Sequence, residues 1–187
     1  MRKLKLQMQL SIDGFVAGAE GEMDWMQWNW DDSLKEYVND ITGPVDTILL
    51  GRKLAGGFIP VWTERDNDPA TSDEFTTKMV HAPKYVFTRT MTRCSWDHTE
   101  LVHGDLVRMV NVLKEQEGGD LIVYGGGNFV GSLISNGLID EYHLFINPTA
   151  IGSGMRIFDQ LDSSRRLQLA DCRKFECGIA VLKYVIA

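Results

Sequence analysis

The sequence predicts an α/β fold in which helices pack on a mixed β-sheet. Through residue 147, short apolar segments typical of strands alternate with segments typical of helices, and this order builds a parallel sheet. The last two strand-like segments, 167–175 and 179–186, flank a short turn at Gly178 and predict an antiparallel hairpin. A sheet that contains both kinds of pairing is mixed.

Eight segments have the composition of strands. Their apolar residues either alternate with polar ones, as over 4–12, or form short continuous runs that end at Gly, Pro or Arg. In the first segment Asp13-Gly14 supplies the turn that ends the strand. The expected strands are residues 4–12, 45–50, 84–88, 99–102, 120–124, 140–147, 167–175 and 179–186.

Five helices are expected, most of them from a start or stop signal. Asp31-Asp32-Ser33 has N-cap character for a helix that continues to about Ile41, before Thr42-Gly43-Pro44. Polar residues 63–74 are expected to form a loop. The other expected helices start at Gly51-Arg52-Lys53, span 74–80, span 105–117 with an amphipathic pattern, and follow Gly125-Gly126-Gly127.

Length and charge restrict the classes of function. A chain of 187 residues fits one globular domain over 1–187. Nineteen Lys and Arg against 26 Asp and Glu give a net charge of −7, which disfavours nucleic acid or an anionic membrane as partner. Three cysteines favour a reducing compartment. Without an apolar run long enough for a signal peptide or a spanning helix, we expect a soluble cytoplasmic protein.

Three strand ends carry residues suited to phosphate. They are Gly51-Arg52-Lys53, Thr88-Arg89 and Gly125-Gly126-Gly127-Asn128. Ligands of open α/β sheets bind beyond the carboxyl ends of strands, and free N–H groups at a helix start hold phosphate where glycine lets it approach. Two such helix starts with additional cations suit a pyrophosphate and an extra phosphate, which favours NADP over NAD.

Each motif also has a simpler explanation. A glycine run after a strand is often only a tight turn, and an Arg-Lys pair at a helix start is usually solvated. The spacing of Gly125, Gly127 and Gly131 fails the Rossmann fingerprint, and no glycine run ends as a P-loop does. Cys94, His98 and His103 lack further ligands, so no metal site is expected.

Five segments with distinctive sequences cover nearly the whole chain. They are QLSIDGFVAG (9–18), DTILLGRK (46–53), KYVFT (84–88), IVYGGG (122–127) and DEYHL…PTAIGSG…F (140–158). In this order they resemble the dihydrofolate reductase-like superfamily, and most closely the reductase (RibD C-terminal) domain of bacterial riboflavin biosynthesis proteins and its stand-alone relatives. The resemblance implies a three-layer α/β/α fold with a mixed central sheet.

The resemblance also implies an NADPH site. In that family the loop after the first strand covers the nicotinamide, which carries over to Ala17. The helix start at the second strand contacts phosphates, the end of the next strand holds the 2′-phosphate, and the glycine turn cradles the pyrophosphate. The corresponding residues here are Arg52, Lys53 and Leu54, then Thr88 and Arg89, then Gly125, Gly126, Gly127, Asn128, Phe129 and Val130.

The substrate side is less defined by the sequence. The resemblance implies an acidic proton donor early in the helix after the covering loop, a region that here contains Asp31, Asp32 and Glu36 with a different spacing to the loop tryptophans. Asp32 is the candidate, with helix capping as the alternative for Asp31 or Asp32. Trp28 and Trp30 are expected to stack on a flat ring, with core packing as the alternative. For a substrate phosphate the candidates, by position alone, are Arg156 and Arg65.

The expected activity is an NADPH-dependent reduction of a small heterocycle. The leading reaction is that of 5-amino-6-(5-phosphoribosylamino)uracil reductase of riboflavin biosynthesis, as the resemblance implies. Alternatives are a dihydrofolate or pterin reductase, and a module that binds NADP without catalysis. Family relatives are frequently dimers, so a homodimer is expected, with the C-terminal hairpin as a possible interface.

Overall fold

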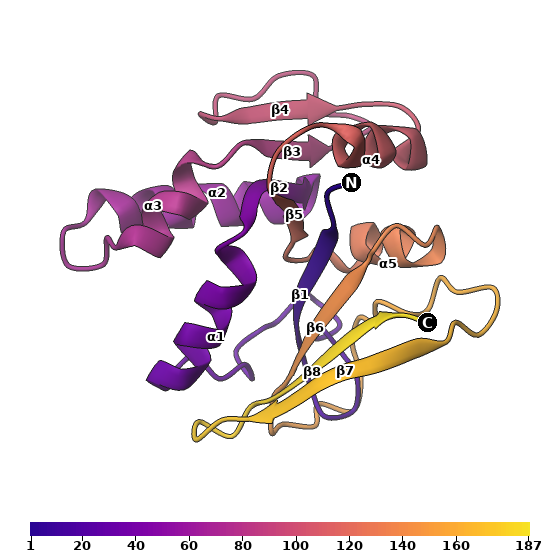
Figure 1. Cartoon of the computed structure of the whole chain (residues 1–187). Coiled ribbons are helices and arrows are strands. Elements are labelled where there is room, and N and C mark those ends of the chain that lie inside the picture. Colours follow the sequence, from indigo (N-terminus) through magenta and orange to yellow (C-terminus); the bar gives the residue numbers. More distant parts are fainter.

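The computed structural model describes all residues from 1 to 187 and contains one eight-stranded sheet (Figure 1). Neighbouring strands follow the order β4-β3-β2-β5-β1-β6-β8-β7. The strands are β1 (Leu4–Leu10), β2 (Val45–Gly51), β3 (Lys84–Phe87), β4 (Thr99–Val102), β5 (Asp120–Val123), β6 (Glu141–Ile146), β7 (Leu167–Lys174) and β8 (Ala180–Ile186).

The sheet is mixed, as the sequence predicts. All pairs from β4 through β6 are parallel, whereas β8 runs antiparallel to both β6 and β7. The carboxyl ends of β1, β2, β3 and β5 therefore lie at the same edge of the sheet, and the chain leaves this edge through the segments expected to bind phosphate.

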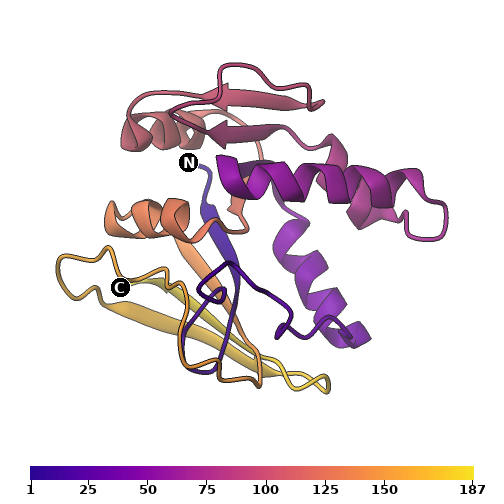
Figure 2. The same cartoon turned by 180° about the vertical axis from the view of Figure 1, so that it is seen from behind.

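Helices cover both faces of the sheet and give the expected three layers (Figures 1 and 2). One face carries α1 (Asp32–Thr42), α2 (Arg52–Asn67) and α3 (Glu74–His81), and the other carries α4 (Leu106–Glu115) and α5 (Gly127–Ser135). Two apolar clusters of 18 and 15 buried residues fill the two spaces between helices and sheet. Alternate residues of the inner strands point into one or the other cluster.

Two expected boundaries are wrong. Residues 63–67 belong to α2 and not to a loop, since the helix continues through Pro60 to Asn67. The polar residues there lie on the solvent side of a helix that buries only Ala55 and Ile59, so they carry no loop signal. The first strand ends at Leu10 rather than residue 12, because the N–H of Ser11 turns to the carbonyl of Phe15.

None of the five helices combines the length and the apolar character that crossing a bilayer requires.

Candidate functional site

Phe129 brings three of the expected phosphate-binding segments together. A Cβ built on Gly51, at the end of β2, would stand 2.9 Å from Phe129 Cβ, so only glycine fits there without movement. The ring of Phe129 packs on Phe87 at the end of β3, with centroids 5.0 Å apart. A Cβ on Gly126 would lie 3.6 Å from Phe129 Cβ. The ends of β2, β3 and β5 thus converge on one side chain.

The glycine turn after β5 has a backbone that glycine favours. Gly125 and Gly126 have φ values of 155° and 84°, which side-chain-bearing residues rarely adopt. A Cβ on Gly125 would reach 3.4 Å from Leu54 Cδ2, and one on Gly127 would reach 3.6 Å from Val16 Cγ2. The turn therefore packs closely against the start of α2 and against the loop that follows β1.

The helix that starts at this turn, α5, and the helix whose start packs against it, α2, differ from the other three. The helices α1, α3 and α4 begin with an aspartate whose side chain accepts a backbone N–H, at Asp31, Asp73 and Asp105. The helices α2 and α5 have Gly51 and Gly126 as N-caps and no side-chain cap. Their first N–H groups are left for another acceptor, and the helix dipole makes an anion the favoured one.

Cations without partners border the same turn. Arg52 and Lys53 open α2, Arg89 follows β3, and all three are exposed and form no ion pair or side-chain hydrogen bond. Thr88 is buried, and its hydroxyl accepts the N–H groups of Thr90 and Met91, which shapes the turn that presents Arg89. In a protein of net charge −7 these are local positive charges.

Two sets of hydrogen bonds hold the loop after β1 against residues 151–155, which follow β6. Ala17 forms a bridge with Met155, whose N–H donates to the Ala17 carbonyl and whose carbonyl accepts the N–H of Val16, each at 2.8 Å. The Asp13 carboxylate accepts the Ser11 hydroxyl and the N–H groups of Ile151 and Gly152. The hydrogen bond from Ser11 lowers the pKa of Asp13 below its ordinary value. Ala17 is thereby fixed on the same side as the glycine turn, which contacts Val16.

The tryptophans occupy a second part of the same sheet edge. Trp30 stacks on Phe145 of β6 with centroids 6.1 Å apart, and Trp28 stacks on Trp30 at 5.9 Å. Trp28 is 62% exposed, so one aromatic face remains free. Beside them, the N–H of Gln27 donates to Asn147, which follows β6. Sequence reasoning did not identify Asn147, whose only signal is its place before Pro148.

The other residues expected to bind substrate lie in different parts of the structure. Asp31 caps α1, as its alternative role predicts, whereas the Asp32 side chain is 99% exposed and pairs with Lys35. No contact joins Asp32 to the loop around Ala17. Arg156 lies over the ring of Phe15, 4.3 Å from its centroid, and so belongs to that loop. Arg65 lies over Trp62, 13 residues along α2 from Arg52, or about 20 Å away.

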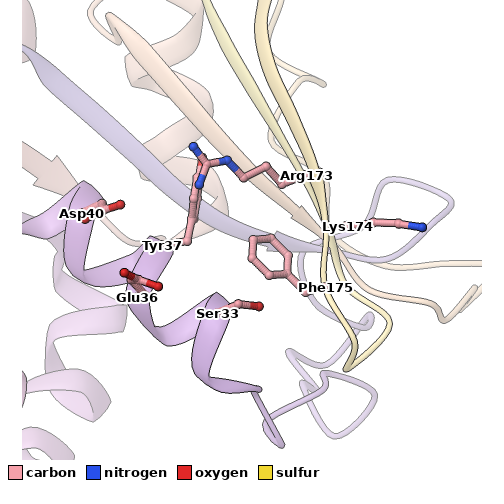
Figure 3. A pocket seen from close by; sticks show the side chains of 7 residues that line it. All are labelled: Ser33, Glu36, Tyr37, Asp40, Arg173, Lys174 and Phe175. Atoms are coloured by element: carbon pink, nitrogen blue, oxygen red, sulfur yellow. The ribbon is translucent and has the colours of Figure 1, made fainter.

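A cavity of about 500 Å³ lies elsewhere, between α1 and the β7–β8 turn (Figure 3). Arg173 reaches over the ring of Tyr37, 5.0 Å from its centroid, while Lys174 points away from the others. None of the expected cofactor residues lines this cavity, and no group of three or more potential metal ligands occurs in the chain.

Comparison with known proteins identifies the family. The model of the RibD C-terminal domain matches residues 2–181. The chain belongs to the RibD C-terminal domain family. It is 33% identical over 187 residues to the "uncharacterized protein YyaP" of Bacillus subtilis, covering 98% of this chain and 94% of that one. It is also 27% identical over 190 residues to YwjB of the same organism, covering 100% and 99%.

Solved structures of RibD-like proteins share the fold. A putative riboflavin biosynthesis protein from Shewanella sp. PV-4 matches with a TM-score of 0.72 and 22% identity, over 99% of this chain and 98% of that one. A deaminase/5-amino-6-(5-phosphoribosylamino)uracil reductase from Thermotoga maritima matches with a TM-score of 0.72 and 17% identity, over all of this chain and 57% of that protein. The dihydrofolate reductase-like fold expected for this RibD C-terminal domain is thus confirmed.

Proposed function

We propose that this RibD C-terminal domain is an NADPH-dependent reductase of a small heterocycle, most like 5-amino-6-(5-phosphoribosylamino)uracil reductase. The supporting observation is the convergence at Phe129 of two helix starts without side-chain caps and a glycine turn, bordered by unpaired cations. The other three helices of the chain have a side-chain cap, whereas these two leave their first N–H groups free for an anion. Free N–H groups at helix starts and unpaired cations, gathered at neighbouring strand ends, have the chemistry of a dinucleotide phosphate site.

The residues fit NADPH segment by segment. The glycine turn and the first turn of α5 suit the pyrophosphate, since the first N–H groups of α5 have no side-chain cap and the helix dipole favours an anion there. The start of α2 adds cations, and Arg89 has the fork of donors that suits the 2′-phosphate, the group that NADH lacks. The residues assigned are Arg52, Lys53, Leu54, Thr88, Arg89, Gly125, Gly126, Gly127, Asn128, Phe129 and Val130, with Ala17 on the nicotinamide side.

Bound NADPH supplies a hydride, so the chain must orient an acceptor and deliver a proton. We assign the stacking of the acceptor ring to Trp28 and Trp30, one of which has an exposed face. Asp32 stays the candidate proton donor. Its exposed carboxylate can act only if the bound acceptor reaches the start of α1, and loss of kcat with unchanged KM in Asp32→Asn is the result that this role requires.

Cofactor titration followed by turnover tests the proposal. Nicotinamide fluorescence is measured as NADPH or NADH is added, and then an aminouracil or pterin acceptor is supplied while the absorbance of the reduced cofactor is followed. We expect tight binding of NADPH, weaker binding of NADH and oxidation with the aminouracil. Absence of NADPH binding contradicts the proposal. Binding without turnover on any acceptor favours a module that holds NADP without catalysis.

We further propose a homodimer formed through the C-terminal hairpin. Leu169 of β7 and Ile186 of β8 are 51% and 45% exposed and lie on the same hairpin, where they offer apolar surface to a partner. The strand β7 also forms an edge of the sheet with unpaired backbone groups. Light scattering should give twice the mass of 21.1 kDa, and Leu169→Lys should shift it to the monomer.

A further inference from the structure

The two faces of β1 have opposite chemistry. One face, Leu4, Leu6, Met8 and Leu10, belongs to the apolar core under α4 and α5. The other face, toward α1, carries Lys5, Gln7 and Gln9. Burying polar groups costs free energy unless they are hydrogen-bonded. Packing of the helix layer does not explain why the central strand of the sheet presents amides on this face.

Two buried atoms of this polar face lack partners. Gln7 pairs with His143 of β6 across the parallel ladder, and their side chains are 7% and 3% exposed. Gln7 Oε1 and His143 Nε2 form no hydrogen bond, and His143 Nε2 lies 3.5 Å from a carboxylate oxygen of Glu141. Such atoms are rare in folded proteins. Gln7 Oε1 is thus a polar atom in this stretch of the sheet that the fold itself leaves without a partner.

At the open end of the same face the orientation of Gln9 is fixed by Asn147. Asn147 is fully buried, and its Oδ1 accepts the backbone N–H of Gln27 at 2.9 Å. Its Nδ2 must then donate, and it does so to Gln9 Oε1 at 2.7 Å. This leaves Gln9 Nε2 as the outward atom, with two N–H groups and no acceptor within the protein. Gln9 is half-buried, so this donor reaches the surface.

The free donor of Gln9 lies beside the aromatic stack. Gln9 is the register partner of Phe145, on which Trp30 stacks. Two residues later, the Ser11 hydroxyl accepts the N–H of Phe15 at 2.9 Å and starts the loop that contains Ala17. A flat ring stacked on the tryptophans would therefore have an amide donor at its edge, at the root of the loop assigned to the nicotinamide.

We propose that Gln9 is a specificity-determining residue that donates a hydrogen bond to a ring carbonyl of the heterocyclic acceptor. The inference rests on the proposed function, because it concerns the acceptor side of the same site. A ring with an amino group at that position would set two donors against each other, and an unpaired buried donor is strongly disfavoured. Gln9 thus selects pyrimidine rings with a carbonyl over those with an amine.

A matched pair of ligands and one exchange of a donor for an acceptor test this role. The probes are 5,6-diaminouracil and 2,4,5,6-tetraaminopyrimidine, which carries amino groups where the first has carbonyls. Their binding to the full chain with saturating NADPH is measured by calorimetry for the wild type and for Gln9→Glu. Glutamate keeps an oxygen for Asn147 Nδ2 and replaces the free donor by an acceptor. The control is Gln116→Glu, an exposed position at the end of α4.

We expect the wild type and Gln116→Glu to prefer the uracil by about tenfold or more. Gln9→Glu should reverse the preference while NADPH affinity is unchanged. If Gln9→Glu does not fold, Gln9→Met, which has no donor or charge, should bring the two affinities close to equality. Unchanged selectivity in a folded variant, or no binding of either probe to a wild type that binds NADPH, overturns the inference alone. A wild type that does not bind NADPH overturns the proposed function instead.

Discussion

Tyr37 Oη lies 2.9 Å from His143 Nδ1, and this contact joins α1 to the centre of the sheet. Both side chains are buried. Burial, reinforced by the charge of Lys183, lowers the pKa of His143 to about 4, against its ordinary value of 6.5. Burial also raises the pKa of Tyr37 to about 12. The imidazole is therefore neutral and the phenol protonated when the protein is folded near neutral pH.

This contact predicts a pH dependence of stability. The unfolded chain takes up a proton at His143 below pH 6.5, whereas the folded chain does so only near pH 4, so folding loses stability as the pH falls through this window. Between pH 7 and 5 the loss is about 2 kcal/mol. Urea unfolding at both pH values should show it. His143→Gln, which offers Tyr37 another acceptor, should remove most of the slope, and the exposed control His81→Gln should keep it. A wild type equally stable at both pH values contradicts this assignment.

The glycine turn predicts a loss of both stability and cofactor binding in Gly126→Ala. At a φ of 84° an L-residue is strained, which costs about 1–2 kcal/mol, and the new Cβ contacts Phe129. Thermal unfolding and NADPH fluorescence titration measure the two effects. Gly56→Ala is the control, because this glycine lies in exposed open space within α2. Alanine there should add about 1 kcal/mol of stability without changing NADPH affinity. Equal effects of the two variants would argue against a special role for the turn.

Arg89 is expected to determine the preference for NADPH over NADH. Its guanidinium has no partner in the protein, so Arg89→Ser should disturb the fold little. Loss of one charge-assisted contact with the 2′-phosphate should weaken NADPH binding about tenfold or more. NADH, which lacks that phosphate, should bind as before. Arg93→Ser, exposed four residues further along, is the matched control. A parallel loss for both nucleotides would assign Arg89 to a part that they share.

The sequence predicts well which strand ends carry the candidate phosphate-binding residues, because patterns of glycine and charged residues are local in the sequence. Gly125-Gly126-Gly127 marks a turn by composition alone, and Arg52 marks a helix start. The role of Gly51 depends on Phe129, 78 residues away, and no local pattern carries a contact of that kind. The same holds for Gln9 and Asn147, which meet only because β1 and β6 are neighbours in the sheet. Asp32 shows the opposite case, since its helix position was predicted but not its full exposure.

Replacement of Asp13 should show how the loop after β1 affects NADPH binding. Its carboxylate accepts two backbone N–H groups, from Ile151 at 3.2 Å and Gly152 at 2.7 Å. In Asp13→Asn one acceptor oxygen becomes a donor, so one of these N–H groups loses its partner. The loop after β1 is then held less tightly against residues 151–155. Amide exchange should then rise over 11–17 and 149–155, and NADPH should bind several-fold more weakly. Asp162→Asn makes the same charge change at an exposed turn and should change neither quantity. Faster amide exchange with unaltered NADPH affinity would mean that Asp13 stabilises the loop without positioning Ala17 for the nicotinamide.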